Sequence, residues 1–208
     1  MVSKRRLDER DIKRRAPKRE PKFRILVACE GRVTERDYFK KFQHDVRNPR
    51  VHIELADETG VPLTVVQIAV RLLSESIRDA KEQRDANLRY DSVWAVFDVD
   101  DHPNLSKACA LASKEGIDIA ISNPCFELWA LLHFQDQRAH VERDVVASML
   151  RNHIRDYDKL LPYERLSSQY QAALKRAMAL YSEAERHEDC RRNPSTSVHK
   201  LTELIRTR

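Results

Sequence analysis

The chain has 208 residues, 41% of them hydrophobic and 34% charged, which suits one sizeable globular domain. No apolar stretch approaches the roughly 20 residues that a membrane helix needs, and the charged N-terminus lacks the apolar core of a secretory signal. We therefore expect a cytoplasmic protein that does not enter a membrane. The four cysteines form no CxxC pair, which argues against a structural zinc site. The sequence also contains neither GxxxxGK[ST] nor GxGxxG, so it has no recognisable nucleotide-binding fingerprint.

Positive charge is concentrated at the N-terminus. Residues 1–24 carry a net charge of +7, so the rest of the chain carries −2 of the total of +5. We expect residues 1–22 to form a basic, flexible arm. Such an arm either contacts nucleic-acid phosphates or is a solvated tail.

Strands and helices are predicted to alternate over the first two thirds of the chain. Apolar or alternating runs predict strands at 22–30, 51–57, 90–98 and 117–122. Helical periodicity predicts helices at 35–43, 63–84, 104–115 and 125–134. Thr34 is expected to cap the first of these helices, Gly116 to end the third in a left-handed conformation, and Asn123-Pro124 to begin the fourth. This alternation is typical of an α/β domain with a mostly parallel sheet flanked by helices.

The pattern changes at about residue 140, where the strand signal stops. Three amphipathic stretches predict helices from there to the C-terminus. We therefore divide the chain into the arm, an α/β domain at 23–138 and a helical extension at 139–208 that packs on it.

Acidic residues stand at the ends of two predicted strands. The first strand ends in Glu30, and the third ends in Asp98, followed by Asp100 and Asp101. In open α/β sheets ligands bind beyond the carboxyl ends of the strands, so we expect these acids to converge. Convergent carboxylates repel one another unless a cation lies among them, and oxygen ligands suit Mg²⁺ or Mn²⁺. For Asp101 alone, a turn or helix-capping role is the alternative.

The motifs that contain these acids resemble those of RloB-like proteins. The similar blocks, in chain order, are "ILVACEGRVTERDYF" (25–39), "VFDVDD" (96–101), "SNPCFELWALLHF" (122–134) and "NPSTSVHKL" (193–201). The resemblance implies a divergent TOPRIM fold, in which a glutamate follows the first strand and D-x-D follows the third. It also implies a Mg²⁺-dependent nuclease that acts on DNA or RNA in prokaryotic antiphage defence, in restriction-linked or abortive-infection loci, beside an AAA-type ATPase partner. An oligomer is compatible with these expectations.

Phosphodiester cleavage needs charge stabilisation at the phosphate, an activated water and a route for the proton of the leaving oxygen. We assign catalysis to Glu30, Asp98, Asp100 and Glu127, and metal binding to Glu30, Asp98, Asp100 and Asp101. Residues expected in an outer shell or at the substrate are Glu35, Asn123, His133, Lys159, His199 and Lys200. All of them except Asn123 have a structural alternative: a first-turn acid for Glu35, a packed histidine for His133, and a solvated helical face for the last three.

Two other functions remain open on the sequence. A non-catalytic TOPRIM module would bind nucleic acid or the ATPase partner, because the chain lacks an obvious lysine in the metal motif. A haloacid-dehalogenase-type phosphatase also has D-x-D after an apolar strand. In that family, however, the first aspartate is a nucleophile on the first strand, and Thr or Val stands where this chain has His102.

Overall fold

A computed structural model of the chain describes residues 21–99, 103–155, 157–187 and 192–208. The predicted arm at 1–22 lies almost entirely outside the described residues, and so do Asp100 and Asp101. Within the described part, no helix combines the length and the apolar character of a membrane span.

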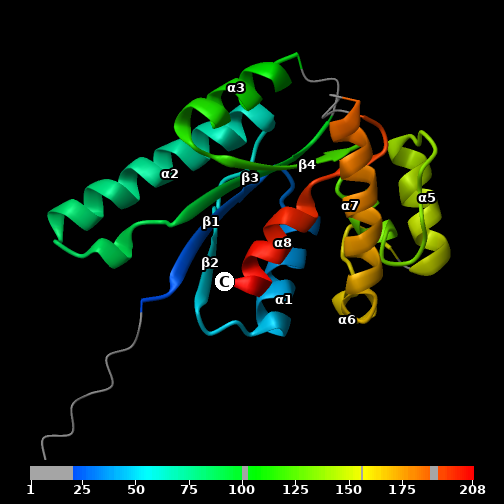
Figure 1. Ribbon diagram of the computed structural model, residues 1–208, viewed down its shortest axis with the longest axis horizontal. Helices are drawn as coiled ribbons and strands as arrows, with labels where there is room; N and C mark the ends of the chain where they lie inside the picture. The colour runs from blue at the N-terminus through cyan, green and yellow to red at the C-terminus, as the bar shows by residue number, and fades with distance from the viewer. Residues whose placement is uncertain (1–20, 100–102, 156, 188–191) are drawn as a thin grey trace, which may run out of the picture.

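The described residues form an α/β fold built on a five-stranded sheet (Figure 1). The strands are β1 (Phe23–Cys29), β2 (Val51–Leu55), β3 (Ser92–Asp98), β4 (Asp118–Asn123) and β5 (Ser195–Thr196). The helices are α1 (Thr34–Val46), α2 (Pro62–Glu82), the 3-10 turn η1 (Ala86–Leu88), α3 (Leu105–Glu115), α4 (Glu127–Leu131), α5 (Arg143–His153), α6 (Tyr163–Ser167), α7 (Tyr170–Arg186) and α8 (Val198–Thr207). The predicted class, a mostly parallel sheet flanked by helices with a helical C-terminal part, is confirmed.

The strands lie in the order β2-β1-β3-β4-β5, and all neighbouring pairs are parallel except the last. Cys29 pairs with Val96 across β1 and β3, and Asp98 pairs with Ser122 across β3 and β4. The carboxyl ends of these three strands therefore finish at the same edge of the sheet. Glu30 comes one residue after the end of β1, so it emerges at this edge together with Asp98.

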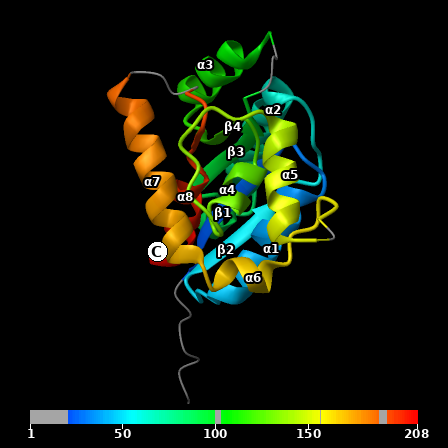
Figure 2. The ribbon, with the colours of Figure 1, turned by 90° about the vertical axis from the view of Figure 1, so that its right-hand side faces the viewer.

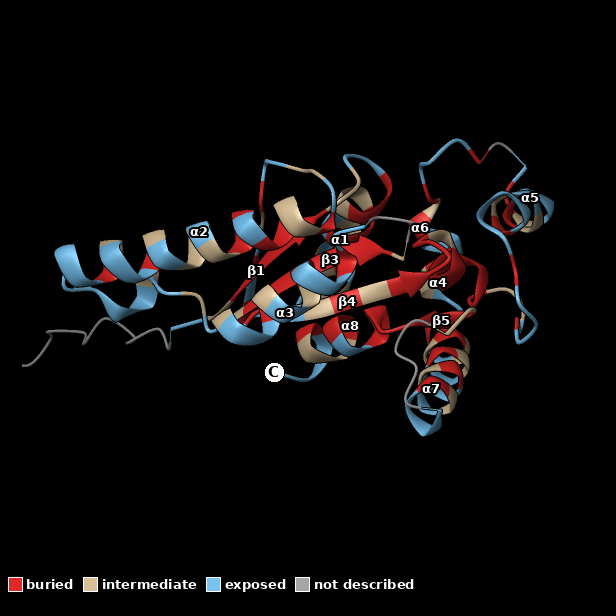
Figure 3. Ribbon diagram, turned by 90° about the horizontal axis from the view of Figure 1, so that it is seen from above, coloured by how far each residue is buried: buried red, intermediate tan, exposed pale blue. Residues whose placement is uncertain are grey.

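The apolar strands are explained by burial on both faces of the sheet. Along β1, Ile25 and Val27 join the cluster that packs under α1, α4, α7 and α8, whereas Leu26 and Ala28 join the cluster under α2 and α3. This alternation is the two-residue period of a strand, and it makes a doubly covered strand continuously apolar. Figure 3 shows the result, with β1 and β3 largely buried and the outer faces of α2 and α3 exposed.

Most of the predicted elements agree with the structure within a few residues. Gly116 ends α3 with φ of 70°, as expected for a left-handed C-cap. Thr34 is the first residue of α1 and makes no cap. The prediction that Pro124 occupies the first helical position is wrong, because α4 begins at Glu127. Strand β4 continues through Asn123, which pairs with β5, so the chain turns before a helix can start.

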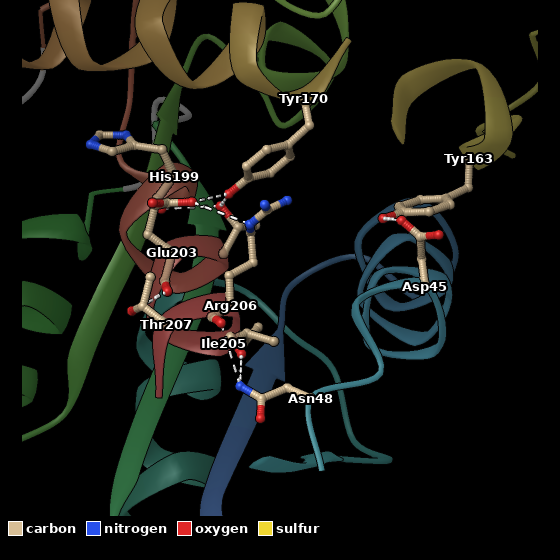
Figure 4. Close-up of polar contacts among 10 residues, drawn as sticks. Asp45, Asn48, Tyr163, Tyr170, His199, Glu203, Ile205, Arg206 and Thr207 are labelled. Atoms are coloured by element: carbon tan, nitrogen blue, oxygen red, sulfur yellow. Dashed lines mark hydrogen bonds and ion pairs between the residues drawn. The ribbon is translucent and has the colours of Figure 1, made fainter. Parts of the chain in front are cut away.

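The C-terminal part differs from the prediction in one respect, because it also contributes a strand. Ser195 and Thr196 form β5, and the Thr196 hydroxyl lies 2.9 Å from that of Ser122 on β4. Two polar residues show no apolar periodicity, so sequence patterning could not detect this strand. Figure 4 shows how α8 is then fastened: the Tyr170 hydroxyl donates to Glu203 at 2.8 Å, and the Asn48 amide donates to the Ile205 carbonyl at 3.0 Å.

Candidate functional site at the carboxyl edge of the sheet

A cavity of about 350 Å³ opens at the carboxyl edge of the sheet. Figure 2 looks onto this side of the molecule, where α4 lies between α7 and α5. The cavity is lined by Glu30, Gly31, Arg32, Val33, Thr34, Glu35, Asp98, Glu127, Arg143 and Lys159. It therefore combines four carboxylates with three cationic side chains, contributed by five separate segments of the chain. We call it the carboxylate cavity.

Glu30 links the first and third strands at this edge. Its Oε2 atom accepts a hydrogen bond of 3.1 Å from the backbone N–H of Asp98. Its own backbone N–H donates to the Val96 carbonyl at 2.9 Å. The register between β1 and β3 thus brings the two predicted acids together, as the sequence led us to expect.

Glu35, on the first turn of α1, folds back over the preceding turn. A Cβ atom added to Gly31 would lie 2.0 Å from Glu35 Oε2, so only glycine leaves room for this carboxyl group. Glu35 is buried, and burial raises its pKa, with further increases from the charges of Glu127 and Glu30. The structure therefore places Glu35 inside the cavity.

Asp98 is the most buried of the predicted metal ligands that the structure describes, with 7% of the residue exposed. Burial raises its pKa well above the ordinary value, and the charges of Glu35, Glu127 and Glu30 raise it further. Arg143 opposes this rise, because its Nη2 atom lies 3.0 Å from Asp98 Oδ2. Arg143 therefore supplies positive charge directly beside Asp98.

Sequence reasoning did not predict Arg143. The residue is the first of α5 and lies 45 positions from Asp98 in the chain. An arginine at the start of a helix opposes the helix dipole, which favours acids there, and this was the one signal that could have drawn attention to it. The Arg143 guanidinium also lies 3.5 Å from the Pro124 carbonyl, so it bridges β3 and the segment before α4.

Glu127, the first residue of α4, is held by a second residue that the sequence did not reveal. The Tyr157 hydroxyl donates a hydrogen bond of 2.8 Å to Glu127 Oε1. Burial and the charge of Glu127 raise the pKa of Tyr157, so this group stays a hydrogen-bond donor. Cys125 lies close by, and burial together with the Glu127 charge raises the pKa of its thiol, which makes it unreactive.

Two exposed cations complete the lining. Lys159 has φ of 61° and reaches the cavity from the segment between α5 and α6. Arg32 follows Gly31, and its Nε atom donates to the Thr59 hydroxyl at 3.2 Å. Both therefore bring positive charge to the lining of the carboxylate cavity.

His133 was expected near the substrate, but the structure places it in the core. Its Nδ1 atom lies 2.9 Å from the Trp129 carbonyl, and its ring packs edge-on against the Trp129 ring at 4.9 Å. Burial lowers the pKa of His133 to about 4, so it stays neutral at physiological pH. Only 1% of the residue is exposed, which leaves no surface for a substrate.

The structure does not bring three other predicted residues to the carboxylate cavity. His199 lies on α8 beside the contacts that fasten this helix to α7 (Figure 4), and its Nδ1 atom lies 3.2 Å from the Thr196 carbonyl. Lys200 Nζ lies 3.8 Å from the centroid of the Tyr181 ring. Asn123 is buried at the end of β4, next to the edge but outside the lining.

The carboxylate oxygens of the cavity are the type of donor that a hard divalent cation takes. Carboxylates that raise one another's pKa store repulsion, which a cation relieves. Among the described residues, which exclude Asp100 and Asp101, no three His, Cys, Asp or Glu side chains are arranged as a metal site. The described carboxylates can therefore supply only part of a metal site. Any further ligands would have to come from residues outside the described part of the chain or from other molecules.

The chain matches the family model described as "RloB-like protein" over residues 25–205. No curated protein matches it, and no solved structure does. The matched range takes up most of the sequence and includes every residue that lines the carboxylate cavity. The resemblance seen in the sequence motifs is thereby confirmed, and the chain belongs to the family of RloB-like proteins.

Proposed function

We propose that this RloB-like protein is a metal-dependent nuclease that hydrolyses phosphodiester bonds in DNA or RNA. We place it as an effector of prokaryotic antiphage defence that works with an AAA-type ATPase. The observation that carries the proposal is the meeting of Glu30, Glu35, Asp98 and Glu127 in one cavity at the carboxyl edge of the sheet. This edge is where open α/β folds bind their ligands.

The proposed metal is Mg²⁺ or Mn²⁺, held by Glu30 and Asp98 together with Asp100 and Asp101. A glutamate after β1 and D-x-D after β3, on adjacent parallel strands, is the arrangement expected of a TOPRIM domain. When bound, the metal supplies positive charge to a phosphoryl oxygen and lowers the pKa of a coordinated water. Arg143 would have to leave Asp98, at least in part, for this carboxylate to become a ligand.

The chain's own side chains would do the rest of the chemistry. Glu127 is the proposed general base, because it is only partly buried and the Tyr157 hydroxyl fixes one of its oxygens. Lys159 and Arg32, which line the cavity and are exposed, would orient the phosphate and offset its charge. Glu35, in its ionised form, would add negative charge to the cavity and so favour the binding of a divalent cation.

A second candidate function is a non-catalytic module that binds nucleic acid or its ATPase partner. The observation in its favour is the ion pair of 3.0 Å between Arg143 and Asp98, which neutralises a carboxylate that the nuclease needs as a ligand. In such a module the acidic residues would be structural, and a metal would change neither binding nor stability.

Cleavage assays on the full chain separate the two functions. Labelled single-stranded and double-stranded DNA and RNA are incubated with Mg²⁺ or Mn²⁺, with and without the neighbouring ATPase. The nuclease proposal expects cleavage that Asp98→Asn and Glu127→Gln each abolish. Asp118→Asn is the matched control, because Asp118 is an exposed carboxylate at the opposite end of β4.

The outcome that overturns the proposal is equally specific. If the purified protein binds nucleic acid but cuts none of the substrates under any condition, and calorimetry detects no metal binding, the non-catalytic module is correct. Cleavage that Asp98→Asn and Asp118→Asn leave equally intact would place any active site elsewhere.

A further inference from the structure

A second cavity, with cationic walls, lies beside the carboxylate cavity. Its volume is about 600 Å³, and it is lined by Lys41 of α1, residues 152–155 at the end of α5, residues 160–162 and Arg165 of α6. Among the residues that line it in the described part of the chain, none carries a carboxylate. We call it the basic groove, defined by Lys41, His153, Arg155 and Arg165.

One short segment joins the two cavities. Tyr157 donates its hydroxyl hydrogen bond to Glu127, and Lys159 lines the carboxylate cavity. The next residues of the same segment, Leu160 and Leu161, line the basic groove. The Lys41 ammonium donates to the Leu161 carbonyl at 3.2 Å and so attaches this segment to α1. The linings of the two cavities are therefore contiguous along residues 159–161.

The charge of the groove is available to a ligand. Arg155 and Arg165 are both exposed, and neither forms an ion pair with a described residue. Lys41 differs, because its ammonium lies 2.8 Å from Asp37 Oδ2, which compensates part of its charge. The two arginines are therefore the groups most able to gain from an incoming anion.

The Phe134 ring packs against two side chains of the basic groove, His153 and Arg165. The His153 imidazole stacks on the Phe134 ring with 4.9 Å between centroids and 7° between planes. The Arg165 guanidinium lies 5.9 Å from the centroid of the same ring. Flat cationic or aromatic groups held in place in this way are the surfaces on which bases of single-stranded nucleic acids stack.

Cationic side chains continue beyond the groove along α1. A neighbouring cavity of about 650 Å³ shares Lys41 and is also lined by Lys40, His44 and Arg47. It also contains the carboxylates of Asp45 and Glu164, and the Tyr163 hydroxyl donates to Asp45 at 3.1 Å. Cationic side chains therefore continue along α1 beyond the basic groove, although two carboxylates lie among them.

We infer that the basic groove binds the sugar-phosphate backbone of the nucleic-acid strand whose scissile phosphate lies at the carboxylates. This inference rests on the proposed nuclease function and adds the path of the substrate over the protein. The observations favour a nucleic acid over an acidic protein, because the groove is continuous with a site for phosphodiester chemistry and offers flat groups for stacking.

Binding measured without metal tests the inference independently of catalysis. The full chain is titrated, in EDTA, into a fluorescein-labelled single-stranded oligonucleotide of DNA or RNA, and the anisotropy is followed over a series of salt concentrations. Arg155→Ala combined with Arg165→Ala is expected to weaken binding by about tenfold or more and to lower the log–log salt slope by about 1.4. Arg78→Ala combined with Lys114→Ala is the matched control, because these side chains are 63% and 78% exposed on α2 and α3 across the sheet. The control is expected to leave both quantities unchanged.

The results separate failure of the inference from failure of the nuclease proposal. If the wild type cuts nucleic acid and the groove variant binds and cuts like the wild type, the groove is not the substrate path, although the nuclease proposal stands. If the wild type cuts nothing but the groove variant still loses affinity, the nuclease proposal fails and the basic groove remains a nucleic-acid site. Polyglutamate that competes as well as an unlabelled oligonucleotide of equal charge would show a general anion surface and overturn the inference.

Discussion

Arg143 and Asp98 form an ion pair of 3.0 Å that joins the start of α5 to the end of β3. Burial raises the pKa of Asp98, three neighbouring carboxylates raise it further, and the charge of Arg143 opposes this rise. The protein therefore offsets part of the negative charge of its carboxylate cavity with one of its own side chains. This ion pair should therefore affect how the stability of the protein depends on pH and on added metal ions.

The metal-free protein is expected to become more stable as the pH falls from neutral. The pKa of Asp98 is raised in the folded state, so between its unfolded value of about 3.9 and its folded value the folded protein binds more protons. The free energy of unfolding must then decrease as pH rises through this window. Asp98→Asn removes the titrating group, so its melting temperature should depend less steeply on pH, with Glu35 responsible for the remaining slope.

Thermal melts in EDTA between about pH 4 and about pH 8 measure this effect. Asp118→Asn is the control and should keep the slope of the wild type, because Asp118 lies exposed at the opposite end of β4. Identical slopes for Asp98→Asn and the wild type would show that Asp98 keeps an ordinary pKa in the folded protein.

The substitution Arg143→Ala should increase the thermal stabilisation that added Mg²⁺ gives the protein. Arg143→Ala leaves the carboxylates without this cation, so we expect a lower melting temperature in EDTA at neutral pH. Added Mg²⁺ should then raise the melting temperature more than it does in the wild type, because the ion no longer competes with the guanidinium. Arg151→Ala, an exposed substitution on the same helix, is the control. A smaller metal-induced shift in Arg143→Ala would mean that Arg143 supports metal binding.

Glu127→Gln and Trp129→Ala should separate function from stability within one helix. The amide oxygen of the introduced glutamine would still accept the Tyr157 hydrogen bond, so the melting temperature should hardly change while cleavage at saturating metal falls. Trp129 is fully buried, and its replacement by alanine should cost about 3–5 kcal/mol of stability through the cavity it leaves. Denaturant titrations and cleavage rates measure the two effects. If Glu127→Gln instead unfolds the protein and its folded fraction keeps full activity, Glu127 is structural.

Gly31→Ala should act through Glu35. The added methyl group would lie 2.0 Å from Glu35 Oε2, so the carboxyl group has to move out of its buried position. We expect a loss of stability that is smaller in a Glu35→Ala background, with a coupling energy of about 0.5–3 kcal/mol in a double-mutant cycle. Gly60→Ala is the control, because its methyl group would meet Thr64 and leave Glu35 untouched. Purely additive effects would show that the contact between Gly31 and Glu35 does not constrain the carboxyl group.

Deleting residues 1–20 should weaken nucleic-acid binding and flatten its salt dependence. These residues include nine Lys or Arg and four Asp or Glu, whereas Arg24, which the sequence grouped with them, is held in β1 by Glu54 at 3.0 Å. Each phosphate contact that is lost should reduce the log–log salt slope by roughly 0.7–0.9. Anisotropy titrations at several salt concentrations measure the slope. An unchanged slope would identify the arm as a solvated tail.

Local patterning was enough to predict the class of the fold and one half of the site. Continuous apolar runs identified β1 and β3 because both faces of these strands are buried, and Gly116 was expected to end α3 in a left-handed conformation. The acids after the two strands followed from the rule that parallel strands end at one edge. Glu30 and Asp98 were therefore predictable as neighbours from the sequence alone.

The other half of the site was decided by tertiary packing alone. Arg143 meets Asp98 across 45 positions of the chain, and Tyr157 meets Glu127 across 30, so no local period or motif connects them. The same packing placed His133 in the core, where its position between apolar neighbours had left its role open. Sequence patterns record the burial of each element, because burial imposes a period of two or of 3.6 residues on the side chains. They do not record which buried faces meet, because that depends on how the elements pack in three dimensions.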